Sequence, residues 1–300
     1  MSVAPLAGTY SGPMSTTRRL VPRGSRRPGF VSTVLLRVGV PVLVGAVLVS
    51  VAFATLPRQA AGTSAGADDG PVVAAEPRSR LVSFADARDR LADPGRPFVV
   101  SVIGDSTGNE QGEWVDLAFR ELSEELDRPL IQHPWDILTN TYLPEVRSNE
   151  DGASAPIIVW NGSASGKTGA YSLTHFATLV PAQPDIVVFN HGLNNVPKPD
   201  TVAPQLTALV AEIERYWPGS VGYAAILENP RFDQWATAHA TVIDNVTSWL
   251  AENQAIRSID VHAAYLAFPD VDSLLLPDLL HPSPAGSGVT AATVLDALRR

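Results

Sequence analysis

The stretch "RPFVVSVIGDSTGNEQGEW" (residues 96–114) decides the fold. Its first part, residues 96–104, is the kind of apolar run that forms a strand buried on both faces. The run ends at Gly104 and is followed by the polar pair Asp105-Ser106. Residues 113–126 then place apolar side chains along one face of a helix. A buried strand, a polar turn and an amphipathic helix are the repeating unit of a parallel α/β sheet.

The same unit recurs along the rest of the chain. Further strands are predicted at residues 156–160, 185–190, 221–227 and 256–261, and helices at residues 171–179, 202–216, 234–252 and 284–300. Five apolar strands separated by helices predict a parallel sheet covered on both faces. Ligands of such sheets bind at the carboxyl ends of the strands, and the polar motifs below follow strands at that end.

The N-terminal part has a different composition. Residues 38–56 are nineteen residues without a charge, and at about 1.5 Å per residue they nearly match a hydrocarbon core of about 30 Å. Arginines precede this run, which predicts a cytoplasmic N-terminus and an extracytoplasmic remainder. We therefore expect a basic cytoplasmic segment (1–29), a transmembrane anchor or signal sequence (30–56), a flexible linker (57–82) and a folded domain (83–300). The alternative is secretion after cleavage, since Ala52-Phe53-Ala54 fits a signal-peptidase site.

Charge and composition exclude several functions. Residues 1–67 carry seven Arg and no other charged residue, so an overall charge of −9 leaves −16 on residues 68–300. Such an acidic body argues against a nucleic-acid partner. The chain has no cysteine, so disulfides, a thiol nucleophile and cysteine zinc sites are excluded. No metal site and no cofactor are predicted, and nothing in the sequence specifies an oligomeric state.

Two motifs could supply a nucleophile and its base. A serine at a strand-to-helix turn, as at Ser106, exposes its hydroxyl beside a helix N-terminus, although Asp-Ser is also an ordinary helix cap. Asp278 stands three residues before His281, so its carboxylate could meet the imidazole Nδ1–H and leave Nε2 free as a base. The rival pair is Asp260 and His262.

Two loops could bind an anion. "NGSASGKT" (residues 161–168) resembles a phosphate-binding loop, but the glycine which that loop requires falls on Asn161, and Gly162 stands one residue too late. What remains is a glycine N–H at the end of a strand, with Lys167 unexplained. In "FNHGLNN" (residues 189–195), Asn194 could direct its side-chain amide at an anion, although glycine and asparagine are also common in turns.

These four motifs in this order resemble the SGNH/GDSL hydrolase family over residues 83–300. The resemblance implies a flavodoxin-like three-layer α/β/α sandwich with a five-stranded parallel sheet. It makes Ser106 the nucleophile, His281 the base and Asp278 its orienting acid. It also implies an oxyanion hole formed by the N–H groups of Ser106 and Gly166 and the side-chain amide of Asn194.

Two positions depart from the family pattern. Family members commonly have Asp where Asn195 stands, so we expect altered support for that loop. Thr107 replaces the leucine of the GDSL motif, which leaves the assignment intact.

The expected function is hydrolysis of acetyl or other short-chain esters on a small-molecule, polysaccharide or envelope substrate outside the cytoplasm. The alternatives are an O-acyltransferase with the same triad and a catalytically inactive carbohydrate-binding module. Trp114 and Trp160 are either sugar-stacking platforms or core residues.

Overall fold

The computed structural model describes residues 81–300. The basic segment (1–29), the predicted membrane span (30–56) and nearly all of the predicted linker (57–82) lie outside the described residues. None of the helices within residues 81–300 combines the length and apolar composition needed to cross a membrane.

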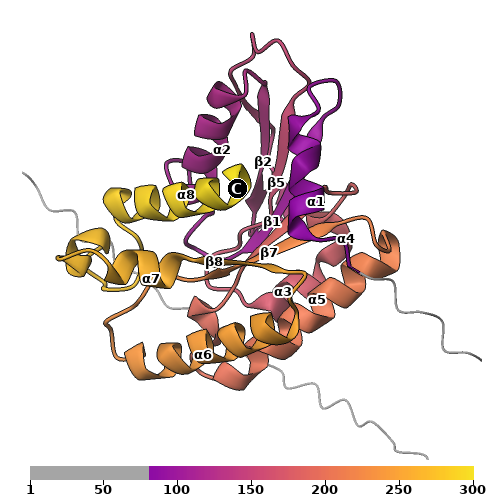
Figure 1. Cartoon of the computed structure of the whole chain (residues 1–300). Helices are drawn as coiled ribbons and strands as arrows, with labels where there is room; N and C mark the ends of the chain where they lie inside the picture. The colour runs from indigo at the N-terminus through magenta and orange to yellow at the C-terminus, as the bar shows by residue number, and fades with distance from the viewer. Residues whose placement is uncertain (1–80) are drawn as a thin grey trace, which may run out of the picture. The chain divides into compact units, whose positions relative to one another are not determined.

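Six parallel strands form the body of the sheet (Figure 1). In spatial order they are β2 (Leu130–Asp136), β5 (Ile157–Asn161), β1 (Phe98–Gly104), β6 (Ile186–Asn190), β7 (Gly222–Leu227) and β8 (Arg257–Asp260). Two short strands, β3 (Thr141–Tyr142) and β4 (Val146–Ser148), pair antiparallel with β2 and complete an eight-stranded sheet.

The prediction of a five-stranded parallel sheet is therefore wrong in the number of strands and in the direction of two of them. The five predicted strands are present, but β2 adds a sixth parallel strand and carries the antiparallel pair. Its sequence, "LIQHPWD", interrupts the apolar pattern with Gln132 and places Pro134 within the strand. Such residues are unusual inside a buried strand, so the sequence pattern concealed it.

Helices cover both faces of the sheet, which confirms the three-layer sandwich. One face packs against α1 (Phe84–Arg88), α2 (Trp114–Glu125), α7 (Val261–Leu266) and α8 (Pro284–Arg299). The other packs against α3 (Gly169–Thr174), α4 (Phe176–Leu179), α5 (Val202–Tyr216) and α6 (Ala236–Glu252). Short 3₁₀ turns lie at Asp89–Ala92, Leu193–Asn195, Pro199–Thr201 and Val271–Leu274.

The two faces follow from the alternation of side chains along each strand. In β1, Val100 and Val102 belong to the core beneath α2 and α8, whereas Ile103 belongs to the core beneath α5 and α6. Both cores are apolar, which is why the central strands lack the alternation of polar and apolar residues seen in half-exposed sheets.

Register brings the polar motifs to one edge of the sheet. Gly104 at the end of β1 lies opposite Asn190 at the end of β6, and Val102 lies opposite Asn161 at the end of β5. The loop after β5 then folds against β1, where the Ala164 N–H donates to the Gly104 oxygen at 3.0 Å. The three loops that follow β1, β5 and β6 therefore meet at the carboxyl edge.

Candidate active site

A hydrogen-bonded chain joins a hydroxyl, an imidazole and a carboxylate at this edge. Ser106 Oγ lies 2.9 Å from His281 Nε2, and His281 Nδ1 lies 2.7 Å from Asp278 Oδ2. The three side chains come from opposite ends of the domain sequence. The structure therefore brings together the predicted nucleophile, base and acid in the predicted order.

A tight turn before α8 places the acid and the base. Asp278 Oδ1 accepts hydrogen bonds from the N–H groups of Leu280 and His281, at 3.1 and 3.0 Å. Leu279 between them has a positive φ of 58°, a conformation that bulky residues rarely adopt. The fold thus accepts local backbone strain to turn the carboxylate toward the ring.

The same turn keeps Asp278 ionised. Partial burial acts to raise the pKa of its carboxyl, but hydrogen bonds from the His281 ring and from two backbone N–H groups together outweigh it and hold the pKa below its usual value. An ionised carboxylate fixes the imidazole with its proton on Nδ1 and leaves Nε2 as the acceptor facing Ser106.

The rival pair has other partners. Asp260 is the N-cap of α7, where its Oδ1 accepts from the Ala263 N–H at 2.8 Å. The His262 ring meets the Glu228 backbone oxygen through Nδ1, at 3.1 Å. Both side chains are used in holding local structure, and they do not form a carboxylate–imidazole pair.

The predicted anion-binding groups lie on two adjoining loops. Asn194 Nδ2 donates to the Lys167 backbone oxygen at 3.1 Å and lies 3.4 Å from Asp105 Oδ2. Within residues 81–300, neither the Ser106 nor the Gly166 N–H donates a hydrogen bond. Gly166 has a φ of +72°, and a Cβ there would meet no atom within 4 Å, so the residue is exposed and free of steric crowding.

The sequence did not explain the role of Lys167 or the effect of Asn195, and both side chains have partners in the structure. Lys167 Nζ lies 5.5 Å from the centre of the Tyr171 ring, a cation–π distance. The Asn195 amide donates to Thr201 Oγ1 at 3.0 Å and to Gln205 Oε1 at 3.1 Å. Asn195 therefore ties its loop to the start of α5.

A second carboxyl group near the nucleophile was not singled out by the sequence. Glu228 follows β7, is 2% exposed, and accepts a hydrogen bond from the Leu193 N–H through Oε2. Burial, followed by the charge of Asp105, raises the pKa of Glu228 well above its usual value. The only feature of the sequence that could have indicated Glu228 is its position, because it is a carboxylate directly after an apolar strand.

Asp105 is the buried partner of Glu228. Its Oδ1 accepts from the Thr107 N–H at 3.2 Å and from the Thr107 hydroxyl at 3.1 Å. Thr107 Oγ1 in turn accepts from Asn190 Nδ2 at 2.7 Å. Burial raises the pKa of Asp105 to about 6, and hydrogen bonds with the Glu228 side chain and with Thr107 oppose that rise. Asp105 thus holds the turn that presents Ser106.

The two tryptophans differ in exposure. Trp114 is 0% exposed, so it is a core residue and not a sugar-stacking platform. Trp160 stacks on His133 with 3.8 Å between ring centres, and the centre of the Tyr142 ring lies 4.8 Å from that of Trp160, with the two rings steeply inclined. One face of Trp160 is therefore covered by His133.

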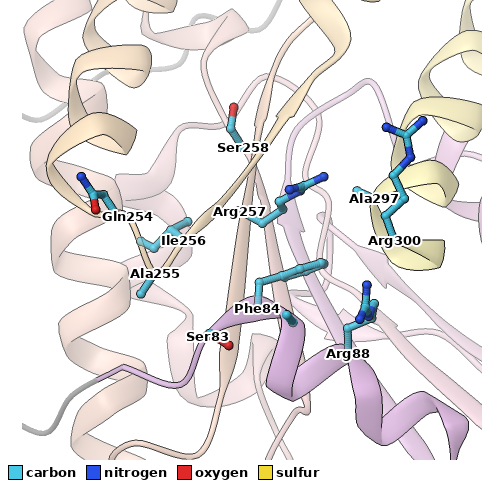
Figure 2. A pocket seen from close by; sticks show the side chains of 11 residues that line it. Ser83, Phe84, Arg88, Gln254, Ala255, Ile256, Arg257, Ser258, Ala297 and Arg300 are labelled. Atoms are coloured by element: carbon cyan, nitrogen blue, oxygen red, sulfur yellow. The ribbon is translucent and has the colours of Figure 1, made fainter.

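A separate groove lies at the opposite end of the sheet. It has a volume of about 340 Å³ and is lined by Arg88, Arg257 and Arg300 among other residues (Figure 2). Arg88 and Arg300 make ion pairs with Asp89 and Asp296. The groove contains the amino end of β8, so it is distinct from the carboxyl edge. Among residues 81–300 no cluster of His, Asp and Glu is arranged to hold a metal ion.

The carboxyl edge of this α/β/α sandwich carries a hydroxyl, an imidazole and a carboxylate, each hydrogen-bonded to the next. This is the arrangement of a serine hydrolase. The sequence profile of the GDSL-like lipase/acylhydrolase family matches residues 102–289, and the chain belongs to this family. The chain is accordingly a carboxylic ester hydrolase, and the resemblance to the SGNH/GDSL family is confirmed. No match was found among curated proteins.

Several solved structures share the fold. A lipase/acylhydrolase from Enterococcus faecalis superposes with a TM-score of 0.50 at 17% identity, over 68% of this chain and 95% of that one. A carbohydrate esterase of family 3 from Talaromyces cellulolyticus gives 0.50 at 19% identity, over 67% and 96%. A two-domain esterase active on acetylated mannans gives 0.52 at 13% identity, over 73% of this chain and 54% of that one. At these identities the similarity is one of fold.

Proposed function

We propose that the chain is a serine esterase that removes acetyl or other short-chain acyl groups from a carbohydrate or other envelope substrate. The observation that carries the proposal is the hydrogen-bonded chain from Ser106 Oγ through His281 to Asp278, at 2.9 and 2.7 Å. This is the contact that a hydroxyl needs to lose its proton to a base as it attacks a carbonyl.

The reaction proceeds in two halves. His281 Nε2 takes the Ser106 proton, Ser106 Oγ attacks the ester carbonyl, and the carbonyl oxygen becomes an oxyanion. The N–H groups of Ser106 and Gly166 and the amide of Asn194 stabilise that oxyanion. His281 then protonates the leaving alcohol and an acyl-enzyme remains. Water, deprotonated by the same imidazole, attacks the acyl-enzyme, and the acid and free Ser106 are released.

A small cavity near the site and the names of similar structures guide the choice of substrate. A small cavity of about 80 Å³ adjoins the loop that follows Ser106, and its polar lining consists of Asn109, Glu110, Gln111, Asp116, Gln132 and Asn161. Its lining also includes the apolar Pro134 and Val146, and its small volume suits a short acyl group better than a long chain. Two of the structures with this fold are named as esterases of carbohydrates, so acetylated sugars are the first substrates to test.

The location of the domain is part of the proposal. The apolar run and its preceding arginines support a single-pass cell-membrane protein with the domain outside the cytoplasm, and secretion after cleavage is the alternative. Protease added to intact cells should digest the domain in both cases. N-terminal sequencing of the extracellular form distinguishes a retained anchor from a cleaved signal, and protection of the domain from protease would contradict both.

The decisive experiment is a screen of the purified domain against acetylated sugars and p-nitrophenyl esters of graded chain length. Ser106→Ala is the matched control, because it removes the hydroxyl and keeps the fold. We expect activity that is highest for acetyl and is lost in Ser106→Ala. Full activity in Ser106→Ala would overturn the serine mechanism, and preference for long chains would overturn the substrate class.

Two other functions are separated by simple additions to that screen. An O-acyltransferase would move the acyl group to an added acceptor alcohol faster than to water. An inactive carbohydrate-binding module would leave Ser106 unreactive toward a fluorophosphonate probe. The intact contact between Ser106 and His281 favours labelling.

A further inference from the structure

Two carboxyl groups are buried against each other beneath Ser106. Asp105 is 0% exposed and Glu228 is 2% exposed, and their side chains are in hydrogen-bonding contact. They follow β1 and β7, on either side of β6. Two ionised carboxylates in contact inside a protein would repel each other and lack hydration, so one of them holds a proton.

The surrounding donors show which group carries that proton. Asp105 accepts at Oδ1 from the N–H and hydroxyl of Thr107, and its Oδ2 faces the Asn194 amide. Glu228 accepts at Oε2 from the Leu193 N–H, but its buried Oε1 meets no donor within the described part of the chain. A proton on Glu228 Oε1, donated to Asp105, satisfies both groups at once.

Other charges around the pair agree with this placement. Arg231, which is 6% exposed, is the cation near Glu228, but its guanidinium is held by Asp233. His262 meets Glu228 only at its backbone oxygen. Burial and the neighbouring Asp105 charge raise the pKa of Glu228 well above its usual value.

Glu228 also binds the loop that carries Asn194. The Leu193 N–H donates to Glu228, and the Leu193 oxygen accepts from the Arg231 guanidinium at 2.8 Å. A side chain at Gly192 would place its Cβ 2.7 Å from Glu228 Oε2, so the loop and the carboxyl group are in close approach. Leu193, the residue before Asn194, is therefore held at both its N–H and its carbonyl oxygen.

The residues after Glu228 hold the other half of the site. Asn229 Nδ2 donates to the Leu280 oxygen at 3.0 Å, and the Phe232 N–H donates to the Leu279 oxygen at 2.8 Å. The segment formed by residues 228–232 thus contacts both the loop of Asn194 and the turn of Asp278 and His281.

We propose that Glu228 is a positioning residue, held as a neutral carboxylic acid, that donates to Asp105 and accepts from Leu193 and so fixes Asn194 beside Ser106. The proposal rests on the proposed function of that site. In this arrangement the hydrogen bond from neutral Glu228 to Asp105 aligns the oxyanion donor Asn194.

Amide substitutions of the two acids test the location of the proton. Glu228→Gln keeps a donor facing Asp105 and an acceptor facing Leu193, so its kcat near neutral pH should stay within about threefold of wild type. Asp105→Asn turns an NH₂ toward groups that are themselves donors and should lower kcat by about 10- to 100-fold. Glu228→Ala should lose a similar factor in kcat with little change in KM. A damaged Glu228→Gln beside an active Asp105→Asn would overturn the proposal.

Infrared spectroscopy supplies a readout that does not depend on hydrolysis. At neutral pH, wild type and Ser106→Ala should show a carboxylic acid C=O band that is absent from Glu228→Gln. Circular dichroism of the three proteins controls for folding, and Ser106→Ala/Glu228→Gln provides the same comparison in an inactive background. A missing band in wild type would overturn the proposal even if the chain hydrolyses esters. A present band without any esterase activity would leave Glu228 as assigned and reject the proposed function.

Discussion

The side-chain amide of Asn194 donates to the backbone oxygen of Lys167 at 3.1 Å. This hydrogen bond joins the loops that follow β5 and β6 at the place where each is proposed to offer a donor to the oxyanion. The amide has two N–H bonds, and its nitrogen also lies 3.4 Å from Asp105 Oδ2, so the longer contact with Asp105 is the one that an oxyanion would replace while the other holds the loop. The two loops should therefore act as one unit.

Asn194→Ala tests that unit. It removes a proposed oxyanion donor and the link between the loops, and we expect a loss of about 3 kcal/mol in transition-state stabilisation, or 10²- to 10³-fold in kcat. KM should change little, because the donor acts on charge that develops only in the transition state. Steady-state kinetics on an acetyl ester measure both. Lys167→Ala is the control, since it keeps the backbone oxygen, and an equal loss there would point to the lysine side chain instead.

His281→Ala and His262→Ala separate the two candidate bases. The first should lower kcat by about 10⁶-fold and leave only the residual rate that the oxyanion hole supports. The second should stay active, because His262 Nδ1 meets a backbone oxygen and not a carboxylate. Asp278→Asn should lose about 10⁴-fold in kcat if it fixes the imidazole tautomer. The reverse order of the two histidine variants would transfer the base to His262.

The raised pKa of Glu228 predicts a pH dependence of stability. A glutamate that stays protonated when folded takes up a proton on folding above its unfolded pKa of about 4.3. Stability relative to Glu228→Gln is then fully present below that pH and falls as pH rises toward the folded pKa, by up to about 1.4 kcal/mol per pH unit. Urea unfolding of both proteins between pH 4 and pH 8 measures the difference. A difference that does not vary with pH would mean that Glu228 ionises normally in the fold.

The backbone conformation of Gly166 alone is expected to limit which residues can replace it. Its φ is +72° and no atom lies within 4 Å of the position that a Cβ would take, so Gly166→Ala should cost about 1 kcal/mol of unfolding free energy through strain and not through a clash. Gly166→Asn should recover part of that loss, because asparagine tolerates this conformation better. Thermal unfolding of the three proteins provides the comparison. Equal losses for alanine and asparagine would mean that the site is crowded after all.

Much of the fold could be predicted because its central strands are continuous apolar runs. The runs that became β1, β5, β6 and β7 were recognisable for that reason, whereas β8 is a short edge strand in which only Ile259 is buried. Strand β2 was not, because Gln132 and Pro134 break the pattern and the strand is recognisable only once β5 lies beside it. The two antiparallel strands are too short to leave a periodic signal.

The candidate site also contains residues that sequence motifs indicate and one residue that they do not. Ser106, Asn194 and His281 stand after strands or before a helix within short motifs. Each motif is weak alone, and their order along the chain and the family resemblance selected them. Glu228 lacks such a motif. Its significance comes from contact with Asp105 and Leu193, which lie far away in the sequence and meet it only in the folded sheet.

The contacts of residues 228–232 have a practical consequence for redesign. That segment contacts both the loop of the oxyanion donor Asn194 and the turn of the base His281. A substitution there therefore alters the positions of both groups and cannot change one alone. Asn109, Glu110 and Gln111 line the small cavity, and the hydrogen bonds of Asn109 and Glu110 stay within their own loop and the start of α2. A library aimed at new acyl or sugar preferences should vary those three positions and hold Glu228 through Phe232 constant.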